Sequence, residues 1–286
     1  MRCWVQLKSL CKSKVFFHIC VICGVFISLI CGSGCGRSFH FSKLQTAGVL
    51  KEQQHALIAG RRDLRVGEKL TYEIRWMGIP VGIASFNVKE IERVNERDCY
   101  HIVATVRSNS FLSKIYRVED EFQTYIDKEM LYSHRFIKKQ AEGRYRSQEI
   151  VNYDQDKHTG IYKSLLNNST KELIIPEKAQ DDLSAIYYFR MQDIDVPSAI
   201  AMNVNADEKN WLLRIEVLRK GIMNLPRIGN LEAIEVEPSA TRTDGKPLKK
   251  GRIWLWFGAD ENRIPLAAKA NAPIVGTVSA VLTQIE

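Results

Sequence analysis

From Val66 onward, apolar and polar residues alternate along most of the chain. In residues 116–127 one set of alternate positions is mostly apolar and the other is polar, which is the pattern of a strand with one buried face. The same alternation recurs at 100–106, 211–217 and 274–282, and turn-forming residues separate such runs. We therefore expect roughly eleven or twelve strands across residues 68–286, arranged mainly as hairpins and a meander.

One segment breaks this period and predicts a helix of about three turns. Asp181 and Asp182 can accept the first amide hydrogens of a helix, and residues 183–190 then place apolar side chains at helical spacing. A sheet of so many strands must curl, and a helix rich in aromatic residues can fill its concave side. The expected fold class is mainly β: a large curled antiparallel sheet, open or half-barrel-like, with one short helix packed against it.

The first residues of the chain have the two parts of an export signal. Residues 1–14 carry four basic residues and no acidic one, and residues 15–31 are almost wholly apolar. The following Gly-Ser-Gly-Cys at 32–35 resembles the lipobox of bacterial lipoproteins, although Gly32 stands where Leu, Val or Ile is usual. We expect residues 1–34 to be a signal peptide of the lipoprotein type and Cys35 to be the lipidated residue. A cleaved secretory signal and a retained anchor are the alternatives, because 17 apolar residues are close to the length that spans a bilayer.

Maturation at this cysteine changes the charge of the protein. The net charge falls from +8 to +4, because residues 1–34 hold four basic residues and no acidic one. Little basis then remains for nucleic acid as a partner. Gly36, rather than Asp, follows the cysteine, and this permits transfer to the outer membrane in enteric bacteria. We expect residues 35–65 to be a tether and residues 66–286 to be a single antiparallel β domain, which faces the periplasm from the outer rather than the inner membrane.

Sequence motifs for catalysis are absent. The nucleophile elbow, the zincin motif, the P-loop and the dinucleotide-binding glycine pattern do not occur. His101, His134 and His158 are isolated in sequence, with no carboxylate or cysteine at metal-ligand spacing. We expect no catalytic residue, no metal and no cofactor, and a hydrolase is the least favoured function.

Two charged residues stand out by their positions. Asp120 falls on the apolar face of its strand, and a buried carboxylate needs partners. We interpret it mainly as part of a structural ion pair or hydrogen-bonded cluster, with Arg144, Arg146 or Arg190 as candidate partners. A ligand-binding or general-base role and a bulge that turns it to solvent are the alternatives. Arg190 ends the predicted helix, where a cation is favoured near the last carbonyls. Recognition of an anionic headgroup is the alternative for Arg190.

A late strand is apolar on both faces, with Trp254 and Trp256 on one side and Ile253, Leu255 and Phe257 on the other. Such a strand is either covered on both sides or lines a cavity. Core packing is the simpler interpretation, and an apolar ligand groove with the aromatic residues of the helix across it is the alternative. The candidate groove residues are therefore Trp254, Trp256, Tyr187, Tyr188, Asp120 and Arg190.

Several segments together resemble a known bacterial family. They are residues 67–74 (GEKLTYEI), 78–82 (GIPVG), 116–120 (YRVED), 183–190 (LSAIYYFR) and 253–265, which runs from IWLWF to RIP. In this order they resemble the domain of unknown function 3108, over about residues 66–284. The resemblance implies an exported, largely antiparallel β domain of Gram-negative-type bacteria, with no activity attached.

These observations predict a non-enzymatic, lipid-anchored protein of the cell envelope. Its concave sheet is expected to bind an apolar or amphipathic envelope component, in analogy to lipoprotein carriers with open half-barrels. The alternative is an envelope scaffold or interaction lipoprotein with a packed core and another envelope protein as its partner. An open cavity beside the helix favours the carrier, and a filled interior favours the scaffold.

Overall fold

The computed structural model describes residues 63–244, 251–272 and 276–286. The predicted signal peptide, the lipidation site at Cys35 and nearly all of the tether therefore lie outside the described residues. Within the described ranges, no helix is both long enough and apolar enough to cross a membrane.

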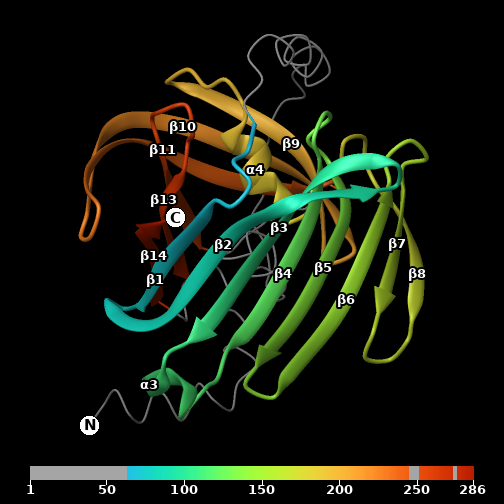
Figure 1. The fold of residues 1–286 in the computed structure, drawn as a ribbon, viewed down its shortest axis with the longest axis horizontal. Coiled ribbons are helices and arrows are strands. Elements are labelled where there is room, and N and C mark those ends of the chain that lie inside the picture. Colours follow the sequence, from blue (N-terminus) through green and yellow to red (C-terminus); the bar gives the residue numbers. More distant parts are fainter. Residues whose placement is uncertain (1–62, 245–250, 273–275) are drawn as a thin grey trace.

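The described chain forms one antiparallel sheet of fourteen strands (Figure 1). Along the sheet the strands follow the order β8-β7-β6-β5-β4-β3-β2-β1-β14-β13-β12-β11-β10-β9. This confirms the predicted fold class. The strands are β1 (Lys69–Trp76), β2 (Ile79–Val94), β3 (Arg97–Ser108), β4 (Glu119–Asp127), β5 (Ser133–Glu142), β6 (Tyr145–Asp154), β7 (Thr159–Ser164), β8 (Thr170–Ile174), β9 (Ser198–Ala206), β10 (Lys209–Leu225), β11 (Gly229–Arg242), β12 (Arg252–Gly258), β13 (Pro265–Ala272) and β14 (Gly276–Ile285).

The strand number exceeds the eleven or twelve predicted because the shortest strands carry little alternation. β8 has five residues and buries only Leu173, and β7 has six residues. Tight hairpins connect several of the longer strands. The two-residue turns Met77–Gly78, Asn95–Glu96 and Asp207–Glu208 all have positive φ at both positions, which matches the twist of the strands that they join.

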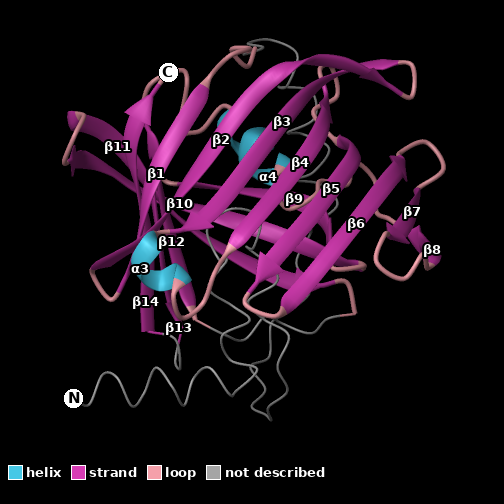
Figure 2. Ribbon diagram, turned by 60° about the horizontal axis from the view of Figure 1, so that its bottom comes forward, coloured by secondary structure: helices cyan, strands magenta, loops and turns pink. Residues whose placement is uncertain are grey.

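The sheet curls until its two edge strands, β8 and β9, approach each other without closing (Figure 2). The segment that follows β8 runs beside β9, where Gln180 and Val204 form a parallel bridge. Lys171 of β8 and Glu208 of the β9–β10 turn form an ion pair of 2.7 Å. The concave side is thereby enclosed on most sides and can bury a core.

Helix α4 (Ser184–Arg190) lies inside this curl (Figures 1 and 2). Tyr187 joins a core cluster formed largely by β1 to β6 and β14, whereas Ala185 and Phe189 join a second cluster formed by β9 to β12. The helix therefore fills the space between the two halves of the sheet, as the sequence predicts, although it is shorter than residues 181–190. A second described helix, α3 (Ser110–Ser113), is a single turn between β3 and β4.

Candidate functional site

The start of α4 is fixed by a reciprocal cap. The Asp181 carboxylate accepts hydrogen bonds from the amides of Leu183 and Ser184, both at 2.8 Å, and the Ser184 hydroxyl accepts one from the Asp181 amide at 2.8 Å. Thr124 of β4 donates its hydroxyl to the same carboxylate. Burial raises the pKa of Asp181, and the hydroxyl and amide donors oppose that increase. The first turn of α4 is thus attached to the middle of the sheet.

A buried ionic cluster lies beside this cap. Lys138 of β5 donates to Asp207 at 2.9 Å and lies 3.0 Å from Glu149. Burial lowers the pKa of Lys138, but these two carboxylates outweigh it and raise the pKa. Asp182 is buried as well, and its Oδ1 has no hydrogen-bond partner within the described part of the chain. Burial and the charge of Asp207 raise the pKa of Asp182 well above its usual range, which favours its neutral form.

The end of α4 is held by a buried ion pair. Arg190 Nη1 and Nη2 donate to the two carboxylate oxygens of Glu68 at 2.7 and 2.9 Å, and both residues are buried. Arg190 also donates to the Asn262 carbonyl at 3.2 Å and lies over the Tyr187 ring, 5.1 Å from its centroid. Burial lowers the pKa of Arg190, but the hydrogen bond and charge of Glu68 outweigh it. The guanidinium fastens α4 to the start of β1, so it already has a carboxylate partner.

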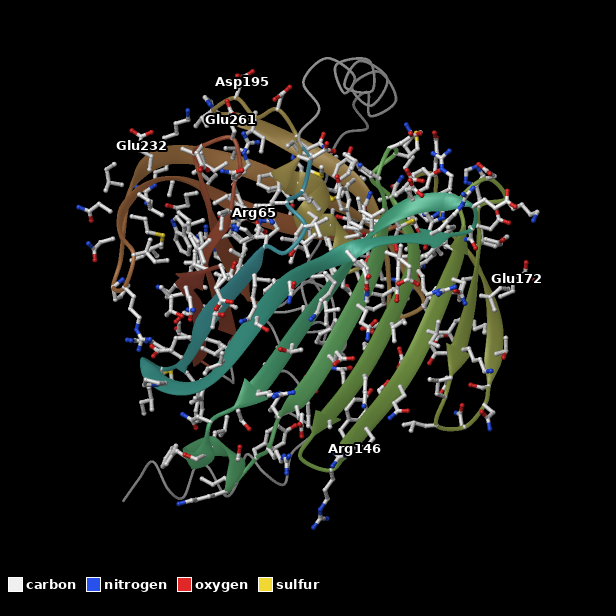
Figure 3. The ribbon with its side chains drawn as sticks, in the orientation of Figure 1. Arg65, Arg146, Glu172, Asp195, Glu232 and Glu261 are labelled. Atoms are coloured by element: carbon white, nitrogen blue, oxygen red, sulfur yellow. The ribbon has the colours of Figure 1, made fainter. Side chains whose placement is uncertain are left out.

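Asp120 is buried, with 3% of its surface exposed, and its carboxylate is hydrogen-bonded to the backbone. Its Oδ1 accepts a hydrogen bond from the Ala141 amide at 2.8 Å, which links β4 to β5. Of the arginines considered as partners, Arg190 binds Glu68, and Arg146 points away from the sheet (Figure 3) and donates to the carbonyls of Gly143 and Tyr145. The predicted pairs of Asp120 with Arg190 and Arg146 are therefore wrong, because both arginines donate to other acceptors. The hydrogen bond from the Ala141 amide fits the hydrogen-bonded interpretation of Asp120 instead.

An apolar cavity of about 40 Å³ lies beside α4 on the concave face. We call it the α4 cavity. Ile186 of α4 forms one wall of the cavity. The lining is apolar except for Lys269, its one charged residue, and the hydroxyl of Tyr72. That hydroxyl donates to the Pro265 carbonyl at 2.8 Å. Other walls come from residues 267–270 of β13, from Ala280 and from Phe86, Ile253, Leu255 and Phe257.

The two tryptophans lie on the other side of β12. Leu255 and Phe257 line the α4 cavity, and strand alternation places Trp254 and Trp256 on the opposite face. Trp254 packs against Arg252, whose guanidinium carbon is 4.8 Å from the ring centroid. The structure therefore places the two tryptophans on the face of β12 away from the cavity, because both faces of this strand are apolar and Leu255 and Phe257 occupy the concave positions.

The other predicted groove residues belong to the packed core. Tyr187 is 1% exposed, and Tyr188 is half-buried against both core clusters.

Sequence reasoning missed Glu68, Lys138 and Ile186. The burial of Lys138 could have been predicted from the sequence, because it shares one face of β5 with the apolar Phe136. Asp120 interrupts the apolar face of β4 in the same way.

A second buried polar group lies at the end of β4. Asp127 accepts hydrogen bonds from His134 Nε2 and Arg97 Nε, both at 2.9 Å, and from the amides of Glu129 and Met130 at 2.7 Å. Burial raises the pKa of Asp127, but these donors outweigh it and hold the pKa well below its usual range. The two amide hydrogen bonds close the β4–β5 turn, and those of His134 and Arg97 tie Asp127 to β5 and β3.

Comparison with known proteins supports this fold and attaches no activity to it. No curated protein matches the chain. A crystal structure of a β-barrel-like protein of domain of unknown function DUF1849 from Brucella abortus aligns with a TM-score of 0.53 at 11% identity, covering 77% of this chain and 97% of that one. A lipoprotein candidate from Parabacteroides distasonis aligns with a TM-score of 0.34 at 9% identity, covering 78% of this chain and 96% of that one.

The family match is more extensive. The sequence profile described as "Protein of unknown function (DUF3108)" matches residues 71–283, a span that includes α4 and runs from β1 to β14. The segments quoted from the sequence fall largely within it. The chain therefore belongs to the DUF3108 family, whose function is unknown.

Proposed function

We propose that this protein is a non-enzymatic, lipid-anchored protein of the cell envelope that binds the apolar end of an amphipathic envelope molecule in the α4 cavity. The observation that carries the proposal is the lining of that cavity, in which Lys269 is the one charged residue. An apolar recess on the concave side of an open sheet is a usual place for an apolar ligand. The anchor is Cys35, and the basic and apolar segments before it support export.

The size of the α4 cavity limits what it can hold. A water molecule needs about 10–15 Å³ of such space, so about 40 Å³ accepts roughly three groups of that size. At about 0.8 kcal/mol for each buried methylene, three such groups contribute about 2.4 kcal/mol. An interaction of this size is weak in solution, and attachment of the protein to the membrane that contains the ligand raises the effective concentration. The ligand therefore inserts one chain end and leaves the rest outside.

A second candidate function is that of an envelope scaffold, whose partner is another envelope protein. It is supported by the packing around α4, because the buried pair of Arg190 and Glu68 fixes the helix and the side chains of the helix belong to both core clusters. In this case the α4 cavity is a packing defect. The protein partner then binds elsewhere on the surface.

Filling the cavity separates these two functions. Ala268 lines the cavity, so Ala268→Leu inserts a larger apolar side chain into it. The control is Ala201→Leu, which makes the same change at a half-buried alanine of β9. Full-length wild type and variants are purified from their own envelope. Non-covalent lipid is measured on the intact protein by native mass spectrometry and, in a second sample, after extraction with organic solvent.

We expect wild type and Ala201→Leu to carry lipid and Ala268→Leu to lose most of it, with a melting temperature equal to or above that of the wild type. Lipid covalently attached at Cys35 remains on the protein and is not counted. Absence of lipid from all three proteins, or equal amounts in all three, would favour the scaffold.

A further inference from the structure

The convex side of the β2–β3 hairpin brings three metal-ligating side chains together. Glu90 and Glu92 of β2 and His101 of β3 each present one ligand atom, and these atoms lie within 4.8 Å of one another. His101 Nδ1 is 4.0 Å from a Glu90 oxygen and 3.9 Å from a Glu92 oxygen. Among the described residues, no lysine or arginine forms an ion pair with either glutamate. Within that part of the chain, two carboxylates without a paired lysine or arginine therefore face one imidazole nitrogen.

A β-bulge creates this arrangement. The register between β2 and β3 shifts between Val88 and Glu90, so Lys89 is an additional residue. Val88 is fully buried in the core, whereas Glu90 pairs directly with His101 on the outer face and Glu92 follows on that face. Without the bulge, the two glutamates would continue the inward-facing positions of the strand. Bulges often redirect side chains in this way next to functional sites.

His101 is oriented by the hydrogen bonds of its second nitrogen. Its Nε2 lies 3.0 Å from Gln123 Oε1, and Gln123 Nε2 donates to Glu121 at 2.8 Å. Because the amide group of Gln123 donates to Glu121, its oxygen is the acceptor for the Nε2–H group of His101. In the neutral ring, Nδ1 then carries the lone pair. The ring also stacks on Tyr125, with centroids 4.5 Å apart.

The Nδ1 atom of His101 is buried, and it has no hydrogen-bond partner in the part of the chain that the structure describes. Histidines that bind metals are usually held in this manner, with the second nitrogen donating to an oxygen that fixes the ring and its tautomer. A lone pair directed at two carboxylates is electrostatically unfavourable unless a cation lies between them.

We propose that Glu90, Glu92 and His101 bind a divalent cation, with Zn²⁺ as the best match. One imidazole nitrogen and two carboxylate oxygens are ligands that zinc accepts, at about 2.0–2.2 Å. Tetrahedral geometry then separates the ligand atoms by about 3.4 Å, and small rotations of the two exposed glutamates reach this spacing. The fourth position is open to water or to a group from a partner.

The site is tested by isothermal titration of the full chain in detergent with Zn²⁺ alone. Wild type is compared with Glu90→Gln/Glu92→Gln. The control is Glu172→Gln/Glu177→Gln, which removes the same charge from two other exposed positions; Glu172, on β8, points outward (Figure 3). We expect the first double variant to bind at this site at least about ten-fold more weakly and the control to match wild type. Gln123→Ala should weaken binding about 10- to 100-fold, because it releases the ring of His101.

Cysteines in residues 1–35 can also bind zinc in unprocessed protein, so Co²⁺ is used to identify the ligands. The proposed site gives visible d–d bands without thiolate-to-metal charge transfer, and these bands disappear in Glu90→Gln/Glu92→Gln. If that double variant does not fold, Glu92→Gln and Gln123→Ala provide the same comparison. Equal Zn²⁺ binding by wild type and the site variants overturns the proposal, as does wild type that binds no metal or binds Co²⁺ through thiolate alone.

Discussion

The buried pair of Glu68 and Arg190 connects the start of β1 to the end of α4, and its removal should destabilise the domain. Glu68→Leu leaves the Arg190 guanidinium, which is 3% exposed, without hydrogen bonds of 2.7 and 2.9 Å to a carboxylate. Removing one partner of a buried ion pair costs about 3–5 kcal/mol. The Asn262 carbonyl and the Tyr187 ring remain as partial partners. We therefore expect a loss near the lower limit, about 3 kcal/mol.

This value is measured by urea unfolding of wild type, Glu68→Leu, Arg190→Met and the double variant. For a domain of about 150–250 residues, 3 kcal/mol lowers the melting temperature by about 6–12 °C. The double variant should recover much of the loss, because replacing both members of a buried pair with apolar residues leaves no unpaired charge. Single variants that each lose less than about 1 kcal/mol, or a double variant that loses the sum of both, would refute the reasoning.

Three further predictions concern single residues. Burial raises the pKa of Asp127, but His134 and Arg97 outweigh it and lower the pKa, so the carboxylate stabilises the fold above about pH 4 and this contribution is lost as the pH falls further. In Asp127→Asn, the free energy of unfolding should therefore fall less steeply between pH 4 and lower pH than in wild type. An unchanged pH dependence would contradict the pairing. Burial raises the pKa of the Cys99 thiol to about 12, so its alkylation at pH 8 should be on the order of 10³-fold slower in folded than in urea-unfolded protein. The rate is measured by mass spectrometry of the peptide that contains Cys99, and similar rates in both states would place the thiol in solvent. Cys35→Ala should abolish incorporation of labelled palmitate and leave a precursor of larger mass, whereas a wild type that takes up no label would rule out the lipoprotein signal.

The curled sheet could be predicted from the sequence because strand alternation reports directly which side chains are buried. The start of α4 could also be predicted from the sequence, because aspartate often caps helices and Asp181 accepts hydrogen bonds from the first amides of α4. The sequence of β12 does not predict which of its residues line the α4 cavity. Both faces of that strand are apolar, so the pattern cannot tell whether Leu255 or Trp256 faces inward.

Contacts between distant parts of the sequence were equally out of reach. Glu68 and Arg190 are 122 residues apart, and no local pattern indicates that one is the partner of the other. The ligands of the proposed cation site depend on a bulge at Lys89, which reverses the inward and outward positions of β2. Simple alternation would place Glu90 on the wrong face, so the cluster with His101 becomes visible only in three dimensions.

Site-specific photo-crosslinking at Ile186 tests ligand binding in the α4 cavity most directly. A diazirine analogue of an aliphatic residue is incorporated at this position, which lines the cavity, and at Ile161 on β7, which is exposed, as the control. After irradiation of full-length protein in its native envelope, the peptide that contains position 186 should carry an added mass of an acyl chain or a lipid, and the control peptide should carry much less. Crosslinks from position 186 that join only residues of this chain, with no added lipid, would contradict ligand binding and leave a packed scaffold.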